Sequence, residues 1–254
     1  MIRSAWVYLN LLVATVPLSI FVIVASLLGA AKFAFVYEGV ARFWARWILW
    51  ASGSTVRLFG VENIVPGRPQ IIAPNHVSWF DVLALAAYIP KRYRFIAKKE
   101  LRGIPFFGRA WQAVGHIAID RSDTQSAIES LDHAARLVRE DNSCIILFPE
   151  GTRSSSAEML PFKKGAFMLA LHTGLDIVPT GVQGTRAIMP KHSWRVSPGR
   201  IIVRFGRPVT TSEYDVGDRD LLMARVRAEI DELRRMPPPE IEEAHVRHHQ
   251  RSRS

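Results

Sequence analysis

The chain contains a single cysteine among its 254 residues, which excludes an internal disulfide. Nothing in the sequence therefore indicates an oxidising compartment. The cysteine, Cys144, lies in the apolar run 144–148, which predicts an inert residue on a buried strand. The sequence also has no internal repeat and no G-x-S-x-G segment. These two absences disfavour a repeat architecture and a nucleophilic serine on a strand-to-helix elbow.

Acidic residues are in the minority, with 23 Asp and Glu against 33 Lys and Arg, a net charge of +10 and a pI of about 10.2. A surplus of this sign predicts acidic partners, such as nucleic acid, an anionic membrane surface or phosphorylated substrates. The composition is not that of a disordered chain, because 48% of the residues are hydrophobic. The length allows one large domain or two small ones.

Charged side chains are absent from residues 5–31, a run longer than the roughly 20 residues that cross a bilayer. Arg3 alone precedes the run and several basic residues follow it, which predicts that the body lies on the cytoplasmic face. A cleavable signal peptide is disfavoured, because its apolar region has roughly 7–15 residues. Pro17 leaves open a bent helix that dips into the membrane without crossing it.

The next segment, residues 33–50, interleaves large aromatic side chains with Arg42 and Arg46. Its aromatic residues are Phe33, Phe35, Tyr37, Phe43, Trp44, Trp47 and Trp50. This pattern is typical of a helix at a membrane interface, and burial against the globular body is the alternative. We expect residues 1–52 to form a membrane-associated pair of helices, bent back towards one leaflet and in contact with anionic lipids.

Residues 53–236 alternate short apolar runs with amphipathic segments. The predicted strands are 70–73, 94–97, 116–119, 144–148, 177–182 and 201–205. The predicted helices are 79–88, 105–113, 125–139, 165–172 and 221–235. This alternation predicts an α/β domain whose mixed, largely parallel sheet is flanked by helices. Residues 237–254 are rich in Pro, His and Arg, and we expect a disordered tail.

One histidine, His76, stands between the apolar run 71–73 and the predicted helix 79–88, and one aspartate, Asp81, lies early in that helix. Residues five positions apart do not share a helix face, so the two can meet only if His76 lies before the helix and folds back. Asn75 or Ser78 is then the helix cap. The carboxylate would fix one ring N–H and leave the other nitrogen free to take a proton from a hydroxyl. The alternative is a loop histidine beside an aspartate that favours the helix dipole.

Further candidate ligands follow other predicted strands. Lys98 lies in the run 91–109, which holds seven basic residues and one acid. A lysine directly after a strand can point at a ligand beyond the sheet, although a solvated basic face is the alternative. Arg121 follows the next predicted strand. Pro179 lies inside the predicted strand 177–182, which indicates an edge, a bulge or the start of a strand.

The segment Phe-Pro-Glu-Gly-Thr-Arg-Ser, residues 148–154, also follows an apolar strand. Gly151 permits a tight turn or a close approach to a ligand. Arg153 can bind a phosphate through two parallel hydrogen bonds. The alternative is a turn with an incidental pair between Glu150 and Arg153.

The order of these segments resembles the 1-acyl-sn-glycerol-3-phosphate acyltransferase family over about residues 61–209: H-x4-D, Lys-Lys-Glu-Leu…Pro-Phe-Phe-Gly, Phe-Pro-Glu-Gly-Thr-Arg-Ser and a Val-Pro strand. The resemblance implies a glycerolipid acyltransferase fold with a membrane-binding helical N-terminus. It also implies transfer of a fatty acyl group from acyl-CoA or acyl carrier protein to the free sn-2 hydroxyl of lysophosphatidic acid, giving phosphatidic acid. It implies no permanently bound cofactor and no metal.

The resemblance assigns catalysis to His76 and Asp81. It assigns binding of the acceptor to Lys98, Arg121, Glu150, Gly151, Thr152 and Arg153, with Arg153 and Lys98 on the phosphate. An acyl-serine at Ser78 is an alternative mechanism. Alternative functions are an acyltransferase for glycerol 3-phosphate or a lyso-aminolipid, and a membrane-bound polyanion-binding protein. The last explains the charge but not the ordered motifs, so nucleic acid is not an expected partner.

Overall fold

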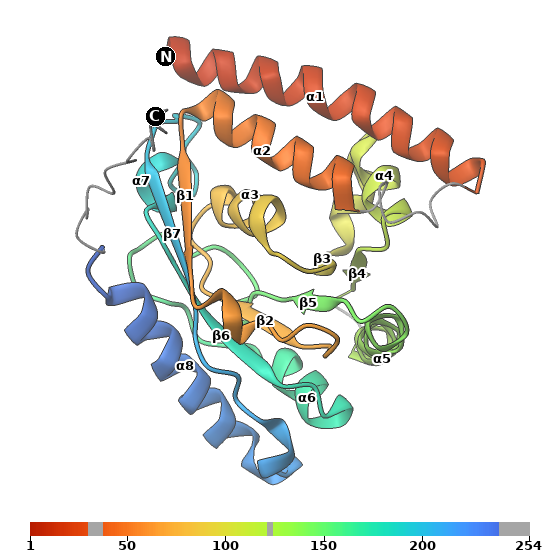
Figure 1. Ribbon diagram of the computed structural model, residues 1–254, viewed down its shortest axis with the longest axis vertical. Coiled ribbons are helices and arrows are strands. Elements are labelled where there is room, and N and C mark those ends of the chain that lie inside the picture. Colours follow the sequence, from red (N-terminus) through yellow and green to blue (C-terminus); the bar gives the residue numbers. More distant parts are fainter. Residues whose placement is uncertain (30–37, 121–123, 239–254) are drawn as a thin grey trace, which may run out of the picture.

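The computed structural model describes residues 1–29, 38–120 and 124–238, except for the side chains of residues 124–129, 131 and 132. A seven-stranded sheet runs through the centre in the order β1-β7-β6-β2-β5-β3-β4 (Figure 1). The strands are β1 (Thr55–Phe59), β2 (Ile71–Pro74), β3 (Tyr93–Lys98), β4 (Ile117–Ile119), β5 (Cys144–Ile146), β6 (Ile177–Gln183) and β7 (Arg200–Phe205). Neighbouring strands are parallel except β6 and β7, which are antiparallel. The predicted mixed, largely parallel sheet is confirmed.

Eight α-helices occur in the described part of the chain. They are α1 (Ile2–Leu27), α2 (Val40–Ser52), α3 (Trp79–Tyr88), α4 (Phe107–Ala113), α5 (Thr124–Glu140), α6 (Lys164–Thr173), α7 (Thr185–Ile188) and α8 (Arg219–Arg235). Short 3-10 turns include η4 (Lys99–Gly103). The five helices predicted in the body are all present. Strand β1 and helix α7 were not predicted.

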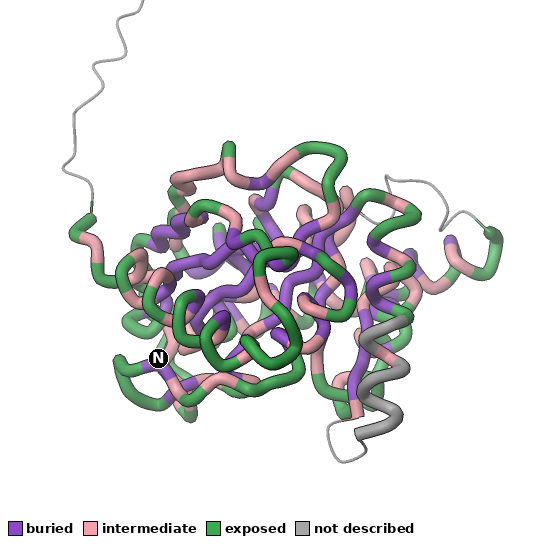
Figure 2. Tube along the Cα trace, turned by 90° about the horizontal axis from the view of Figure 1, so that it is seen from below, coloured by how far each residue is buried: buried purple, intermediate pink, exposed green. Residues whose placement is uncertain are grey.

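The helices cover the two faces of the sheet separately (Figure 1). Ile72 of β2 packs in a cluster with residues of α1, α2 and α3, whereas Ile71 and Ala73 pack in a cluster with residues of α5, α6 and α8. Successive residues of a strand point to opposite faces, so one short strand contributes to both layers. The buried segments accordingly gather in the interior, with exposed segments around them (Figure 2). Cys144 is buried on β5 as predicted, and burial raises the pKa of its thiol to about 12.

Helix α2 has one face in the core and one face in solvent. Ala45, Ile48 and Leu49 are buried in the same cluster as the sheet, while Phe43 and Trp50 are exposed. The predicted helix pair is therefore present, but α2 is packed into the body. Residues 33–37 of the predicted interfacial segment lie outside the described residues.

The two arginines of α2 have a different role from the one that the aromatic pattern indicated. Arg42 donates to the carbonyls of Ile89 and Lys91, and Arg46 donates to the carbonyl of Ala87 at 3.1 Å. Both guanidinium groups therefore bind carbonyls at the C-terminal end of α3, where backbone acceptors are left over and positive charge is favourable. The outer face of α2 is formed mainly by Phe43, Trp47 and Trp50, with Arg46 exposed beside them.

Helix α1 is long and apolar enough to cross a membrane by its length and composition, and it continues through Pro17. One side of α1 packs along α2 and α4, and Figure 1 shows it lying across the top of the molecule. Its outer side exposes apolar residues along its length, among them Trp6, Leu9, Val13, Phe21 and Val24. This outer side and the exposed side chains of α2 form one apolar face, which suggests association with a membrane.

Pro179 lies in an internal strand, at a bulge. Ile177 pairs with Val209, and Thr180 pairs with Phe205. Two residues separate these positions on β6 and three on the opposite segment, so the ladder is interrupted there. The missing N–H of Pro179 falls in this interruption, while its carbonyl accepts from Gly206 at 2.8 Å. Of the three predicted explanations for this proline, the bulge is confirmed.

Candidate active site

His76 and Asp81 meet at the carboxyl end of β2. The imidazole Nδ1 lies 2.9 Å from Oδ2 of Asp81, because His76 lies before the helix and folds back, as this contact requires. Asp81 is fully buried, and the His76 side chain keeps 12% of its surface exposed. Because Asp81 occupies Nδ1, the second ring nitrogen is the one left for an incoming group. This geometry is suited to a base and a carboxylate that orients it.

The fold of this loop follows from the helix cap. Ser78 is the N-cap of α3: its hydroxyl accepts from the N–H of Phe80 at 3.2 Å, and Oδ2 of Asp81 accepts from the N–H of Ser78 at 2.8 Å. The same carboxylate oxygen accepts from the N–H of Val77 at 2.7 Å. This capping box fixes the first turn of α3 and turns the carboxylate back towards His76. Asp81 therefore contacts His76 and also places a negative charge at the N-terminus of α3. These two roles were predicted as alternatives, and the structure combines them.

Asn75 does not cap the helix. Its side chain donates to the carbonyl of Val182 at 3.0 Å and accepts from the N–H of Val182 at 2.7 Å. These two bonds continue the pairing of β2 with β6 beyond the last paired residues, Pro74 and Thr180. Asn75 thus fixes the point at which the chain leaves the sheet just before His76.

The segment after β5 holds His76 from the other side. The ring of Phe148 stacks on the imidazole, with 3.9 Å between ring centroids and 22° between planes. Glu150 accepts from the N–H of His76 at 2.7 Å, and the carbonyl of His76 accepts from the N–H of Ser154 at 2.7 Å. The second oxygen of Glu150 accepts from the N–H of Leu160 at 2.8 Å. Glu150 therefore joins two loops, and it makes no ion pair with Arg153 in the described part of the chain.

Glu150 is almost completely buried. Burial raises the pKa of its carboxyl group, and the hydrogen bonds from the N–H groups of Leu160 and His76 act in the opposite direction. A buried carboxylate is costly unless it is hydrogen-bonded, and here each oxygen has a backbone donor. The site therefore uses this glutamate to fix loop geometry.

Arg153 lies near the pair of His76 and Asp81. Its guanidinium stands over the ring of Trp79, 5.1 Å from the ring centroid. Desolvation lowers the pKa of Arg153, while the negative charge of Asp81 acts in the opposite direction. Among the described residues no carboxylate forms an ion pair with it. A partly buried guanidinium that is oriented by an aromatic ring and lacks an internal counter-ion is suited to an anionic ligand.

The residues around Arg153 shape the same loop. Gly151 has a φ of 72°, so the tight turn predicted for it is confirmed. Thr152 is exposed. The ammonium group of Lys191, in the segment after α7, donates to the carbonyl of Arg153 at 2.6 Å. No sequence pattern had singled out Lys191.

Two other cations, Lys98 and Arg121, were predicted to bind the acceptor, and Lys98 is not brought into contact with His76 or Arg153 in the described part of the chain. Lys98 is exposed at the end of β3, which is separated from β2 by β5. The carboxyl ends of these parallel strands share one edge of the sheet, so Lys98 lies on the correct edge. The neighbouring Lys99 forms an ion pair with Asp120. Arg121 lies outside the described residues.

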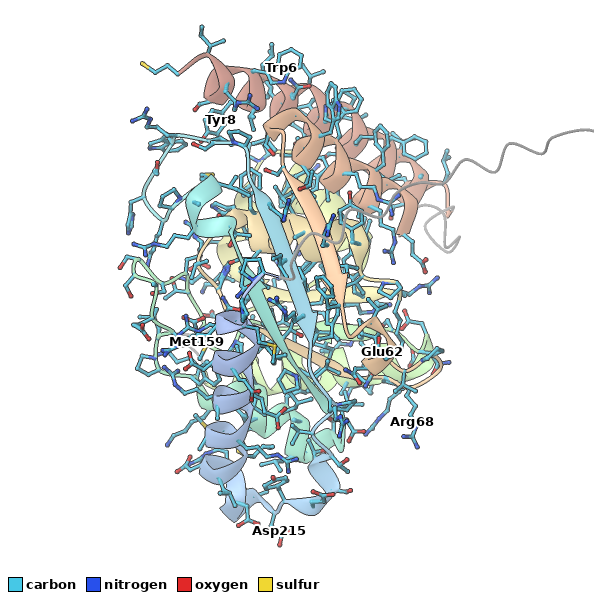
Figure 3. All side chains as sticks on the ribbon, turned by 60° about the vertical axis from the view of Figure 1, so that its left-hand side comes forward. Trp6, Tyr8, Glu62, Arg68, Met159 and Asp215 are labelled. Atoms are coloured by element: carbon cyan, nitrogen blue, oxygen red, sulfur yellow. The ribbon has the colours of Figure 1, made fainter. Side chains whose placement is uncertain are left out.

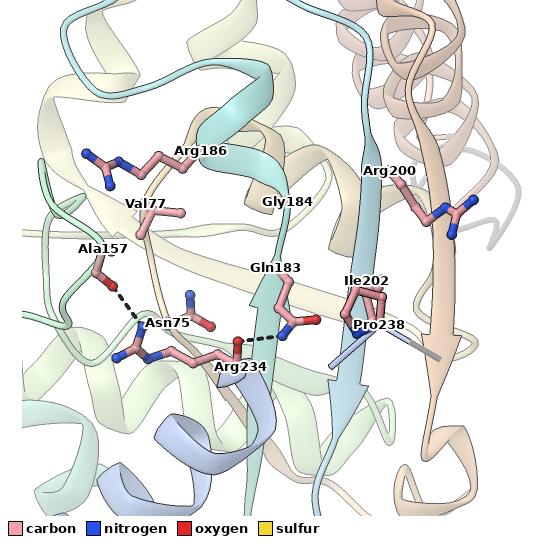
Figure 4. A pocket seen from close by; sticks show the side chains of 10 residues that line it. All are labelled: Asn75, Val77, Ala157, Gln183, Gly184, Arg186, Arg200, Ile202, Arg234 and Pro238. Atoms are coloured by element: carbon pink, nitrogen blue, oxygen red, sulfur yellow. Dashed lines mark hydrogen bonds between the residues drawn. The ribbon is translucent and has the colours of Figure 1, made fainter. Parts of the chain in front are cut away.

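A pocket of about 700 Å³ opens beside the loop that carries Asn75 and Val77 (Figure 4). Asn75, Val77 and Gln183 line it, together with Arg186, Arg200 and Arg234 from α7, β7 and α8. Arg234 is occupied by the carbonyl of Ala157, at 2.7 Å, and by nearby carboxylates. No group of three or more His, Cys, Asp or Glu side chains suited to a metal ion occurs in the described part of the chain.

The family model that matches this chain is that of the acyltransferases, over residues 55–183. The chain belongs to the acyltransferase family. The match runs from β1 to the end of β6, so this acyltransferase domain includes the site from Asn75 to Arg153 and leaves out α1, α2, β7 and α8. Lys191 also lies beyond it.

The chain is 39% identical over 170 residues to the 1-acyl-sn-glycerol-3-phosphate acyltransferase of Cocos nucifera, covering 67% of this chain and 54% of that protein. It is 33% identical over 202 residues to the protein of the same name from Haemophilus influenzae, covering 74% of this chain and 82% of that one. The chain thus spans only 54% of the coconut protein and 61% of its Limnanthes douglasii relative.

The chain also resembles the crystal structure of the 1-acyl-sn-glycerophosphate (LPA) acyltransferase PlsC from Thermotoga maritima. The TM-score is 0.76 at 26% identity, with 93% of this chain and 97% of that chain covered. The similarity therefore extends beyond the family domain, because this coverage exceeds the range 55–183.

Proposed function

We propose that this protein transfers a fatty acyl group from acyl-CoA or acyl carrier protein to the sn-2 hydroxyl of 1-acyl-glycerol 3-phosphate, giving phosphatidic acid. The observation that carries the proposal is the orientation of His76 by buried Asp81, next to a partly buried Arg153 that has no ion pair among the described residues. The names of the relatives support the same acceptor. The thioester carries the acyl group, so no permanently bound cofactor is needed.

His76 acts as the general base in this reaction. Its free ring nitrogen takes the proton of the acceptor hydroxyl while that oxygen attacks the thioester carbonyl. Asp81 holds the tautomer with its proton on Nδ1 and stabilises the imidazolium that forms. When the tetrahedral intermediate collapses, the C–S bond breaks and the imidazolium returns the proton to the leaving thiolate. Phe148 holds the plane of the ring during both steps.

Several backbone N–H groups near His76 already have acceptors and are therefore not available to bind the oxyanion. The N–H of His76 donates to Glu150, and those of Val77 and Ser78 donate to Asp81, so these three are occupied. The N–H of Gly151 donates to the carbonyl of Phe148 at 3.0 Å. We propose that the oxyanion is bound by a donor of the segment 152–153, where no backbone N–H has an acceptor among the described residues.

The alternative acyl-serine route is disfavoured by the position of Ser78. The residue is fully buried, and its hydroxyl donates to the carbonyl of Met189 at 2.7 Å while it accepts from Phe80. A nucleophile needs an accessible oxygen next to its base, and here the imidazole contacts Asp81 instead. Ser78 is therefore a structural cap.

The phosphate monoester of the acceptor binds Arg153 through two parallel hydrogen bonds, with Lys98 and Arg121 as further ligands in this proposal. Such binding places the hydroxyl near His76 by proximity. The exposed apolar face of α1 and α2 favours a lipid acceptor held in a membrane over water-soluble glycerol 3-phosphate. Since α1 lies along the body, we propose that both helices bind one leaflet on the cytoplasmic side of the membrane.

The test is an assay of the purified protein with labelled 1-acyl-glycerol 3-phosphate in vesicles. Acyl-CoA and acyl carrier protein are compared as donors, and glycerol 3-phosphate, a lyso-aminolipid and 1-acyl-glycerol as acceptors. We expect labelled phosphatidic acid, and much slower reaction with the acceptor that lacks the phosphate. Product from a lyso-aminolipid alone would contradict the proposed acceptor, and no product from any acceptor would contradict the proposed function.

A further inference from the structure

We infer that residues 189–196, called the strap below, form a second membrane contact that connects the bilayer surface to the phosphate-binding loop. Trp194 is the residue that enters the lipid interface. The occupant of this surface is a bilayer leaflet that contains anionic lipids. The inference builds on the proposed membrane-bound function, and it concerns a segment outside the family domain.

The first part of the strap contacts the candidate active site twice. The carbonyl of Met189 accepts from the buried hydroxyl of Ser78, the cap of α3, at 2.7 Å. The ammonium group of Lys191 donates to the carbonyl of Arg153 at 2.6 Å. One contact supports the loop of His76 and the other the loop of Arg153.

The second part of the strap lies against α1. The hydroxyl of Tyr8 donates to the carbonyl of Trp194 at 3.0 Å, and the two rings are in contact with 6.0 Å between centroids. The N–H of Val196 donates to the hydroxyl of Ser4 at 3.0 Å. Figure 3 shows Tyr8 near Trp6 at the end of the molecule formed by α1. The strap thus spans from the active-site loops to the apolar helix.

Trp194 is 78% exposed although its backbone carbonyl is bound. Tyr8 and Asn10 are two positions apart on α1, so they lie about 200° apart around the helix axis. Asn10 accepts from the indole N–H of Trp47 at 3.1 Å, whereas Tyr8 contacts Trp194. Exposed tryptophans therefore flank α1 on both sides. Tryptophan is enriched at membrane–water interfaces, because its ring is apolar and its N–H is polar.

The charge of the surrounding sequence favours an anionic lipid surface. Residues 186–200 contain no Asp or Glu and include four basic residues, Arg186, Lys191, Arg195 and Arg200, none of which is buried. Basic residues near an anionic leaflet are attracted to it, and the attraction falls with added salt. With Trp194 held in the leaflet, the strap keeps Lys191 on the Arg153 loop at the surface where the lipid acceptor enters.

The experiment compares Trp194→Ser, Trp194→Phe and Leu221→Ser in the full chain. Leu221 is 63% exposed in the first turn of α8, shortly after Asp215, which Figure 3 shows at the opposite end from Trp6 and Tyr8. Binding is measured by sedimentation with phosphatidylcholine vesicles, with and without phosphatidylglycerol. Quenching of tryptophan fluorescence by bromine-labelled lipid is measured in parallel. Acyl transfer is measured with vesicle-bound and with monomeric short-chain lysophosphatidate.

We expect Trp194→Ser to weaken binding to anionic vesicles by about tenfold, as for the loss of a large apolar side chain from an apolar environment. The ratio of the rate on vesicles to the rate on the monomeric acceptor should fall, through KM more than kcat. Trp194→Phe should keep vesicle binding and this ratio close to the wild-type values, but it should lose part of the quenching by lipid. Leu221→Ser should behave as the wild type.

Equal vesicle binding and equal quenching in wild type and Trp194→Ser would overturn the inference. So would an equal loss with Leu221→Ser, because the effect would then not belong to the strap. Binding and quenching do not depend on catalysis. A wild-type protein that binds through Trp194 but transfers no acyl group would support the strap and contradict the proposed function, so the two failures are distinguishable.

Discussion

The polar residues of the loop 75–81 perform local structural tasks, and in the proposed mechanism Asp81 has a chemical role as well. Oδ2 of Asp81 accepts from His76, Val77 and Ser78. Because the capping box fixes the carboxylate, its position does not depend on His76. The spacing alone allowed His76 and Asp81 to meet only if His76 lay before the helix, and the order of the other motifs favoured this arrangement. The sequence could not predict the roles of Asn75 and Lys191, because their partners are 107 and 38 positions away along the chain.

Asn75 gives a prediction about loop positioning. Asn75→Ala should lower the free energy of unfolding by about 2–4 kcal/mol, because the buried N–H and carbonyl of Val182 both lose their partner. Asn75→Asp should also destabilise, because its buried carboxylate still accepts from the N–H but cannot donate to the carbonyl of Val182. Denaturant unfolding and the rate of acyl transfer measure the two effects. Equal stability of wild type and Asn75→Ala would show that the two bonds do not hold the loop.

Arg153 gives a prediction about the acceptor. Arg153→Lys should weaken use of lysophosphatidate by about 1.5–3 kcal/mol, because a lysine cannot form two parallel bonds to a phosphate. The loss should appear mainly in KM for the phosphorylated acceptor and much less with 1-acyl-glycerol. Arg225→Lys, on the exposed side of α8, is the matched control. If both acceptors lost the same activity, Arg153 would not be the phosphate ligand.

At the scale of elements, sequence patterns predicted those that are long or strongly apolar. The bounds predicted for α3 coincide with the observed ones, because a cap and a buried strand frame it. Strand β1 was not predicted, since its exposed and partly buried residues alternate at the edge of the sheet directly after α2. Arg42 and Arg46 matched an interfacial pattern but bind the carbonyl groups at the end of α3. Only the packing of α2 on α3 distinguishes these two roles.

Neighbouring residues of α2 provide a test of its two faces. Leu49→Ala should lower stability by about 2–5 kcal/mol, because Leu49 is buried in the core. Trp50→Ser should leave the melting temperature nearly unchanged and weaken vesicle binding, because Trp50 is 64% exposed beside Trp6. Thermal unfolding and vesicle sedimentation separate the two effects. Loss of stability in Trp50→Ser with unchanged binding would contradict the assignment of this face to the membrane.

At the scale of the whole molecule, the two N-terminal helices α1 and α2, the sheet and the candidate site form one unit. The core cluster of α1 and α2 also contains Ile72 and Phe80, which lie on either side of His76 in the sequence. The sequence predicted a mixed, largely parallel sheet flanked by helices. It did not predict this continuity, because residues 1–52 and the body were interpreted from separate local patterns.

The acid stability of the protein should depend on His116. Desolvation, with the charge of Arg94, lowers the pKa of His116 to about 3, and its Nδ1 accepts from the N–H of Phe95 at 3.2 Å. The pKa in the unfolded chain is about 6.5, so between these values the unfolded state binds the proton and the folded state does not. Stability is therefore lost as pH falls below about 6.5, with a slope approaching 1.4 kcal/mol per pH unit.

His116→Gln, which keeps an acceptor for Phe95, should flatten this dependence. Denaturant unfolding of both proteins at several values from about pH 7 to pH 4 isolates the contribution, because the carboxylates are common to the two. A constant stability difference between the two proteins across this pH range would show that His116 does not cause the loss of stability in acid.

The most direct test of the account is acyl transfer to lysophosphatidate by wild type, His76→Ala, Asp81→Asn and the double variant, each checked by circular dichroism and melting temperature. We predict that His76→Ala removes nearly all transfer and keeps the fold, that Asp81→Asn is severe through the wrong tautomer, and that the double variant is little worse than His76→Ala. A folded His76→Ala protein with near-normal turnover would contradict general-base catalysis by His76.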